Sequence, residues 1–264
     1  MIRIYRQLLT AQFQAAAQYR IQFVLWMLFS VIRPTIFLAA WVAVASAQGG
    51  SVSGYSTAAF AGYYVALTLV GHLTAAWDFF EFEYEIRQGT FSAKLLRPLH
   101  PLHYAIVQAV VFKLSTLPML GVALLLLAVT FGARFDAQPM NYVLFVPSVI
   151  LGWLVNFMVG WCVASSAFWL SRVHTVTTIM QRISFMFAGQ IAPIALMPAA
   201  LQVVCWVLPF AYSLAVPAMI LRGDVSPDQA LLLMAGQVVW LAISFAAFQI
   251  IWRSGLRQFS AVGG

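Results

Sequence analysis

Four of the seven acidic residues in this chain lie between Asp78 and Glu85. Asp78, Glu81 and Glu85 share one helix face by their spacing, and Glu83 can pair with Arg87 four residues further on. Clustered carboxylates could hold a metal ion, as in membrane enzymes that handle diphosphates. Such a site would need a second acidic motif facing the first, and the sequence has only this cluster. A solvated helix face that forms ion pairs fits better, and an integral-membrane enzyme using these carboxylates is the alternative.

The other residue types that perform chemistry are scattered along the chain. Cys162 and Cys205 both lie in apolar runs without CxxC spacing, which indicates buried, inert thiols. The four histidines form no HExxH or similar group, and there is no GxxxxGKS or GxxxxGKT phosphate loop. We therefore expect no catalytic residues, no metal site and no cofactor bound by this chain.

The composition indicates an integral membrane protein. The chain is 63% hydrophobic and 8% charged, with a mean hydropathy of +0.91. A soluble domain carries about 25% charged residues, so this chain has too little polar surface for one. The net charge of +7 could suggest nucleic acid, but the basic residues form no stripe. We expect them to set orientation and to contact anionic lipid headgroups, with no nucleic acid bound.

Hydropathy predicts a single all-α transmembrane domain over residues 1–264. About 20 apolar residues make a span, which gives six segments: 22–46, 57–80, 103–132, 141–170, 177–197 and 229–252. Residues 1–21 read as an amphipathic helix in the membrane interface, or as an extension of the first span. Residues 198–222 contain Pro198, Pro209 and Pro217 and predict two short re-entrant helices. The alternative for this region is a crossing kinked at Pro209.

The distribution of Lys and Arg predicts the orientation. With six spans and both termini in the cytoplasm, ten of the fourteen Lys and Arg residues lie inside, and Arg134 and Arg222 lie outside. A seventh crossing would weaken this asymmetry. We therefore expect a multi-pass protein of a bacterial-type inner membrane with both ends cytoplasmic.

The link at 81–102 contains the most polar stretch in the first half of the chain, "IRQGTFSAKLLRPLHPLHY" (residues 86–104). We expect the second span to continue past the membrane as one helix to about Arg87. Gly89 is a stop signal for this helix, and Thr90 or Ser92 could cap a new one. A helix from Thr90 to Leu96 would be about 10 Å long and would end before Pro98 and Pro101. We expect Phe91 and Leu95 on one side of it, and Lys94 and Arg97 towards another. This shape suits docking on another protein.

This loop resembles the cytoplasmic loop of ABC-2 type permeases, in the branch with an "LLRPL-x-P" run. The resemblance covers nearly the whole chain, and the matching loop positions are Arg87, Gly89, Leu95, Leu96, Arg97, Pro98, Leu99 and Pro101. It implies a permease subunit that pairs with an identical or related subunit and with two copies of a separate ATPase, which binds ATP and Mg²⁺. The loop, with Thr90, Phe91 and Lys94, would be the coupling helix. Viologen-like organic cations are among the cargos proposed for such exporters. A secondary transporter is the further alternative.

Polar residues inside the predicted spans are candidates for a substrate pathway. Arg33 could face a cavity or a subunit interface, or could snorkel. Gln181, Met186 and Gln190 suit a permissive path for a bulky amphiphile, although they could equally be packing residues. For Lys113 we expect snorkelling, and for His72 and Asn156 hydrogen bonds between helices.

Overall fold

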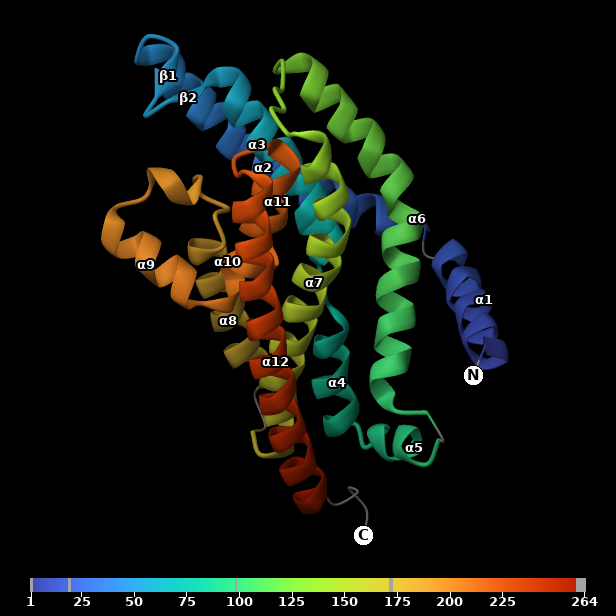
Figure 1. The fold of residues 1–264 in the computed structure, drawn as a ribbon. Coiled ribbons are helices and arrows are strands. Elements are labelled where there is room, and N and C mark those ends of the chain that lie inside the picture. Colours follow the sequence, from blue (N-terminus) through green and yellow to red (C-terminus); the bar gives the residue numbers. More distant parts are fainter. Residues whose placement is uncertain (1, 19, 98, 171–172, 260–264) are drawn as a thin grey trace.

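The computed structural model describes residues 2–18, 20–97, 99–170 and 173–259, which are almost entirely helical (Figure 1). A short antiparallel hairpin joins the second and third helices. The predicted all-α membrane class is confirmed. The elements are α1 (Ile2–Gln18), α2 (Arg20–Ala47), β1 (Ser51–Val52), β2 (Tyr55–Ser56), α3 (Thr57–Thr74), α4 (Asp78–Arg87), α5 (Phe91–Leu95), α6 (Pro101–Thr130), α7 (Pro139–Ala164), α8 (Val173–Phe187), α9 (Ala199–Val207), α10 (Pro209–Ser213), α11 (Ala215–Arg222) and α12 (Pro227–Gln258), with short 3₁₀ helices at Ser165–Phe168 and Ile194–Leu196.

Four helical segments of the described chain are long and apolar enough to cross a membrane. They are Val24–Ala47, Pro101–Thr130, Pro139–Phe168 and Pro227–Gln258, and they correspond to the first, third, fourth and sixth predicted spans. The second predicted span contains α3, of 18 residues, and the fifth contains most of α8, of 15 residues. Both helices are shorter than the roughly 20 residues that a crossing needs. The chain is a multi-pass membrane protein, and six crossings stay a prediction.

The helix α7 lies at the centre of the bundle. It packs along α12 and also contacts α3, α10 and α11, whereas α3 packs against α2, α6 and α11. The N-terminal segment is helical as predicted, and α1 lies beside α6, where the Tyr5 hydroxyl is hydrogen-bonded to the imidazole of His103. Figure 1 shows α5 and the end of α12 at one end of the molecule, with the hairpin and the α6–α7 link at the other.

The second predicted span is interrupted, which the sequence did not indicate. We expected one helix to continue to about Arg87, but α3 ends at Thr74 and α4 begins at Asp78. The predicted stop is confirmed, because α4 ends at Arg87 and Gly89 has a φ of +71°, a conformation that favours glycine.

Residues 198–222 form three short helices where we predicted two. The breaks fall at Leu208 and Leu214, and Pro209 is the first residue of α10. The helix α11 ends at Gly223, which has a φ of +88° and packs so closely on the backbone of Asp136 and Ala137 that a Cβ would lie 2.3 Å from the Ala137 nitrogen. Whether this region dips into the membrane or crosses it stays a prediction.

A non-helical segment, residues 188–193, follows α8 and is bound by aromatic donors from α2 and α3. The Tyr63 hydroxyl donates to the Gly189 carbonyl at 2.7 Å. The Ile191 carbonyl accepts from the Tyr64 hydroxyl at 2.7 Å and from the Trp41 indole at 2.8 Å. A buried carbonyl without a hydrogen-bond donor costs free energy, so carbonyls outside regular helices need donors from side chains. These side chains supply them.

Candidate functional site

The predicted coupling loop forms a short, sharply turned unit at one end of the bundle. Thr90 Oγ1 donates to the Glu85 carbonyl at 3.4 Å, and Lys94 forms an ion pair with the Glu85 carboxylate. Both interactions connect the segment around α5 back to the end of α4. The five-residue helix is therefore held against α4 at a fixed turn, as the Gly89 stop suggested.

The ring of Phe91 fastens α5 to the rest of the chain. Phe91 is fully buried and makes edge contacts with Phe82, Trp252 and Phe259, at centroid distances of 4.9, 5.9 and 5.6 Å. Aromatic pairs in this geometry stabilise beyond the area they bury. We predicted Phe91 and Leu95 on one side of this helix, and the structure separates them, because Phe91 is buried and Leu95 is 37% exposed. Phe91 faces inward because aromatic side chains of α4 and α12, among them Phe82 and Trp252, lie behind α5.

The surface that α5 presents outward is formed by the next residues. Leu95 is 37% exposed and Leu96 is 88% exposed, an unusual exposure for a leucine. Arg97 is also exposed, and its guanidinium lies 5.6 Å from the centre of the Tyr104 ring. We call Leu95, Leu96 and Arg97 the outer face of α5. It combines apolar area with one positive charge.

The segment from the outer face to α6 returns to the core. Leu99 and Pro101 are buried, and the His100 ring lies 5.0 Å from that of Trp252. His100 Nδ1 accepts from the Leu102 amide at 3.3 Å and so caps α6. Burial, and secondarily the charge of neighbouring His103, lowers the pKa of His100. Of the predicted site, Pro98 and the side chain of Arg87 lie outside the described residues.

The aromatic side chains behind α5 were missed by sequence reasoning. They come from α4, α7, the following 3₁₀ helix and the end of α12, and they are Phe82, Phe157, Trp161, Phe168, Phe248, Trp252 and Phe259. The 15% aromatic content of the chain was a signal that such a cluster exists. It gave no indication of which rings meet.

Two carboxylates of α4 form a hydrogen bond and an ion pair within the chain, and the side chains of Asp78 and Glu83 lie outside the described residues. Glu85 pairs with Lys94, and the Glu81 carboxylate accepts from the Gln108 side chain at 2.8 Å. Among the described residues, no group of three or more His, Cys, Asp or Glu side chains could hold a metal ion. The ion-pairing interpretation is confirmed for Glu85, although with Lys94 and not within α4. No observation favours the membrane enzyme.

The pathway candidates lie on α2, on α8 and after α8. Arg33 is exposed, and its guanidinium lies 5.4 Å from the centre of the Phe185 ring on α8. Met186 is 52% exposed, Gln181 is half-buried, and Gln190 is half-buried in the non-helical segment after α8. The structure thus brings Arg33 of α2 next to Phe185 of α8, and leaves the role of the pathway candidates as a prediction.

The polar residues inside the bundle form hydrogen bonds between helices. His72 Nε2 and Thr116 Oγ1 lie 2.9 Å apart, and Asn156 donates to the Thr74 carbonyl at 2.8 Å. Both were predicted to bond between helices, and this is confirmed. Lys113 Nζ donates to the Ala75 carbonyl at 2.8 Å, a partner inside the protein that the snorkelling interpretation did not include.

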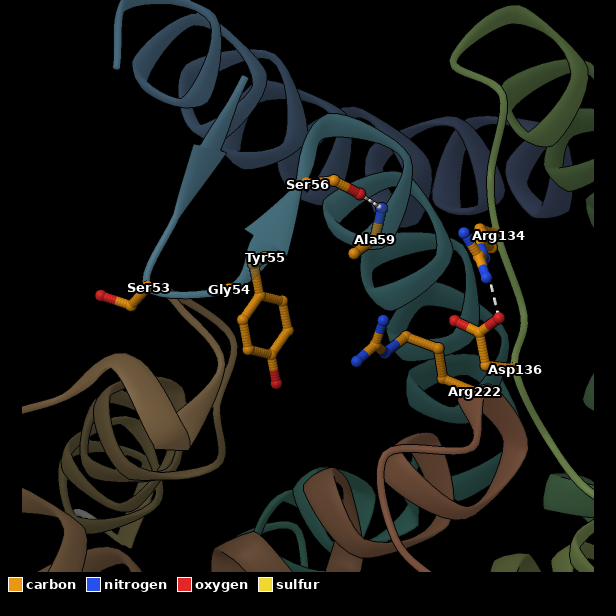
Figure 2. A pocket seen from close by; sticks show the side chains of 8 residues that line it. All are labelled: Ser53, Gly54, Tyr55, Ser56, Ala59, Arg134, Asp136 and Arg222. Carbon is orange, nitrogen blue, oxygen red and sulfur yellow. Dashed lines mark hydrogen bonds and ion pairs between the residues drawn. The ribbon is translucent and has the colours of Figure 1, made fainter. Parts of the chain in front are cut away.

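A second group of charged residues lies at the opposite end of the molecule, around a pocket of about 380 Å³ (Figure 2). Arg222 Nε donates to the Asp224 carboxylate at 2.7 Å, and the Arg222 guanidinium lies 5.0 Å from the centre of the Tyr55 ring. Arg134 Nε donates to the Asp136 carboxylate at 2.7 Å. Each guanidinium has a carboxylate partner, so the pocket carries no uncompensated charge from these four groups. The Tyr55 contact joins the hairpin to the end of α11, and the Asp136 amide, which donates to the Arg222 carbonyl at 2.9 Å, joins the α6–α7 link to the same point.

The fold and the loop together define a membrane component of a transporter. The chain has several apolar spanning helices and a short anchored helix that presents an apolar and basic face at one end. Residues 29–263 match the family model for the ABC-2 family transporter protein, and the chain belongs to that family. No curated protein matches the chain in a sequence search.

Proposed function

We propose that this chain is the membrane-spanning subunit of an ATP-driven exporter and that the outer face of α5 docks on a separate ATPase subunit. Two permease subunits, identical or related, form the pathway, and two ATPase copies bind ATP and Mg²⁺. Membership of the ABC-2 family supports the general scheme. The docking role of α5 is the more specific part of the proposal.

The observation that carries this role is the contrast between the start of α5 and the residue that follows its end. Its first residue, Phe91, is completely buried, whereas Leu96, directly after α5, is 88% exposed at the end of the molecule that also holds the C-terminal end of α12 (Figure 1). A short helix with a rigid base and an exposed leucine is suited to transmit force. In water the exposed leucine is unfavourable, and a partner protein would remove it from solvent.

In this scheme, closure of the ATPase dimer displaces α5, and α4 carries the displacement into the membrane. The pathway then opens alternately to the two sides at the interface between permease subunits. Arg33, Gln181, Met186 and Gln190 are the proposed pathway residues, and a bulky amphiphile is the proposed cargo. The contact of Arg33 with α8 supports a shared face.

The proposed topology places both termini and α5 in the cytoplasm of a cell with a bacterial-type inner membrane. The positions of the hairpin and of α5 at opposite ends of the molecule support it (Figure 1). Single cysteines at Gln138 and Asp228, in a chain lacking Cys162 and Cys205, should react with an impermeant thiol reagent added outside intact cells. A cysteine at Thr90 should not. Labelling of the cysteine at position 90 from outside would show that the orientation is opposite to the proposed one.

The test of docking is co-purification with a candidate ABC ATPase subunit produced together with this chain. Burying a leucine contributes about 1.5–3 kcal/mol, so Leu96→Asp should weaken ATPase binding by roughly 10- to 100-fold. Arg97→Glu should weaken it through the reversed charge. Arg253→Glu is the matched control, because Arg253 is exposed near the same end but lies on α12. If both α5 variants retain the ATPase as well as Arg253→Glu does, the docking role is wrong.

A further inference from the structure

The interruption between α3 and α4 occurs where the sequence favours a continuous helix. Residues 75–77 are Ala75, Ala76 and Trp77, with neither proline nor glycine. Alanine has the highest helix propensity of the amino acids, so the local sequence does not cause the break. Nevertheless Ala75 has a ψ of 138°, which ends α3. Interactions from elsewhere in the chain must impose it.

Two side chains bind the carbonyls that the break leaves open. In a continuous helix the carbonyls of Thr74 and Ala75 would accept from the amides four residues later. Here the Thr74 carbonyl accepts from Asn156 Nδ2, and the Ala75 carbonyl accepts from Lys113 Nζ, both at 2.8 Å. Each donor takes the place of one backbone amide, so the broken form leaves neither carbonyl unsatisfied.

The donors come from two of the helices on which α4 packs. Asn156 belongs to α7 and Lys113 to α6, and α4 contacts both helices. The Lys113 ammonium also lies 5.1 Å from the centre of the Trp153 ring, one turn before Asn156 on α7. The lysine therefore bridges α6, α7 and the end of α3 at one point.

We propose that Lys113 and Asn156 are positioning residues that clamp the second span as two segments, so that α4 and α5 pivot about residues 75–77. A push on α5 then rotates α4 against the clamp, and α3 receives a redirected movement. Without the break, α3 and α4 would move as one rod. The clamp itself is a property of this chain, whereas its part in transmission rests on the proposed function.

The geometry can be tested on the chain alone in lipid nanodiscs, without ATPase or cargo. Spin labels at Thr57 on α3 and Tyr84 on α4 report the distance across the break, and labels at Thr57 and Leu73 report α3 itself. All are placed in a background lacking Cys162 and Cys205. The wild-type pair across the break should give one narrow distance distribution.

Removal of both donors should release α4. In Lys113→Met/Asn156→Leu the distribution across the break should shift or at least double in width, while the pair within α3 stays unchanged. Lys113→Arg keeps a cationic donor and, with Asn156 intact, should preserve the wild-type distribution. Thr116→Val is the matched control, because it removes the nearby bond to His72 without touching the break. An unchanged distribution in the double variant would overturn the clamp.

Transmission is tested by adding the ATPase with ATP and vanadate. In the wild type the distance across the break should change on trapping, and the double variant should lose at least half of that change while still binding the ATPase. If trapping leaves the wild-type distance unchanged in an assembled complex, the pivot is wrong. If the ATPase does not bind the wild type at all, the proposed function fails. The distance distribution across the break, measured on the chain alone in nanodiscs, still tests whether Lys113 and Asn156 form the clamp.

Discussion

Replacing Phe91 by alanine removes the ring that packs α5 against the aromatic side chains of α4 and α12. Phe91 is the buried residue of this five-residue helix, and its ring contacts those of Phe82, Trp252 and Phe259. The backbone bonds at α5 are few, among them the Ala93 amide to the Thr90 carbonyl at 3.2 Å. The position of α5 therefore depends strongly on this one side chain.

The expected magnitude follows from the burial. A Phe→Ala change in a protein core costs about 3–5 kcal/mol, and each 1.4 kcal/mol is a factor of ten in an equilibrium. If the whole cost fell on the docking of α5, its detached state would be populated at least about 100-fold more often. The ion pair of Lys94 with Glu85 and the buried Leu99 remain and reduce the effect. We expect an increase of about tenfold or more.

The population of the detached state of α5 can be measured by hydrogen exchange with mass spectrometry on peptides covering residues 88–99. Local opening of α5 exposes its amides, so Phe91→Ala should exchange faster there and not at the far end of the bundle. Leu96→Ala is the control, because Leu96 is 88% exposed and contributes little to packing. If the two variants exchange alike across 88–99, the ring does not hold α5, and the reasoning from burial is refuted.

Three further outcomes follow from single contacts. Tyr63→Phe leaves the buried Gly189 carbonyl without its donor and should lower the free energy of unfolding, measured by heat or denaturant, by about 1–3 kcal/mol. Tyr64→Phe should lower it less, because the Ile191 carbonyl keeps the Trp41 indole as a donor. Gly62→Ala should lower the melting temperature, since the new Cβ would lie 2.1 Å from a backbone oxygen, and Gly121→Ala, with nothing within 4 Å, should not. Because the pKa of His100 is lowered in the folded chain, the unfolded chain binds more protons below pH 6.5, and the free energy of unfolding falls as the pH drops from there. In His100→Gln the free energy of unfolding should change less between pH 7.5 and 5.5. The same change in both chains would contradict this.

Local signals in the sequence were sufficient to locate α5. Gly89 and Pro101 lie on either side of α5 and interrupt helices through their own backbone conformations. Hydropathy likewise located the long helices, because a span is a contiguous property of the sequence. The predicted helix from Thr90 to Leu96 was one residue too long at each end, because α5 spans Phe91–Leu95.

The features that the sequence did not reveal depend on distant residues. Ala75 and Ala76 read as helix, and the donors that interrupt it at Thr74 and Ala75 lie 82 and 38 residues away in the chain. The inward direction of Phe91 depends on Trp252 and Phe259, which no local periodicity connects to a helix of five residues. The pattern of polar and apolar residues in so short a helix distinguishes its two sides, but it does not tell which side packs against the rest of the chain.

The contact between Phe91 and the end of α12 has a consequence for biosynthesis. A chain enters the membrane from its N-terminus as it is made, so the α5 segment is synthesised more than 150 residues before Trp252 and Phe259. Until those residues arrive, the ring of Phe91 lacks part of its packing, and α5 is not yet fully held in place. The packing that holds the outer face is therefore completed only after the last helix has been inserted. In a nascent or truncated chain the contact with Phe82 and the ion pair of Lys94 with Glu85 remain, and we expect α5 to be held less firmly there than in a chain made through α12.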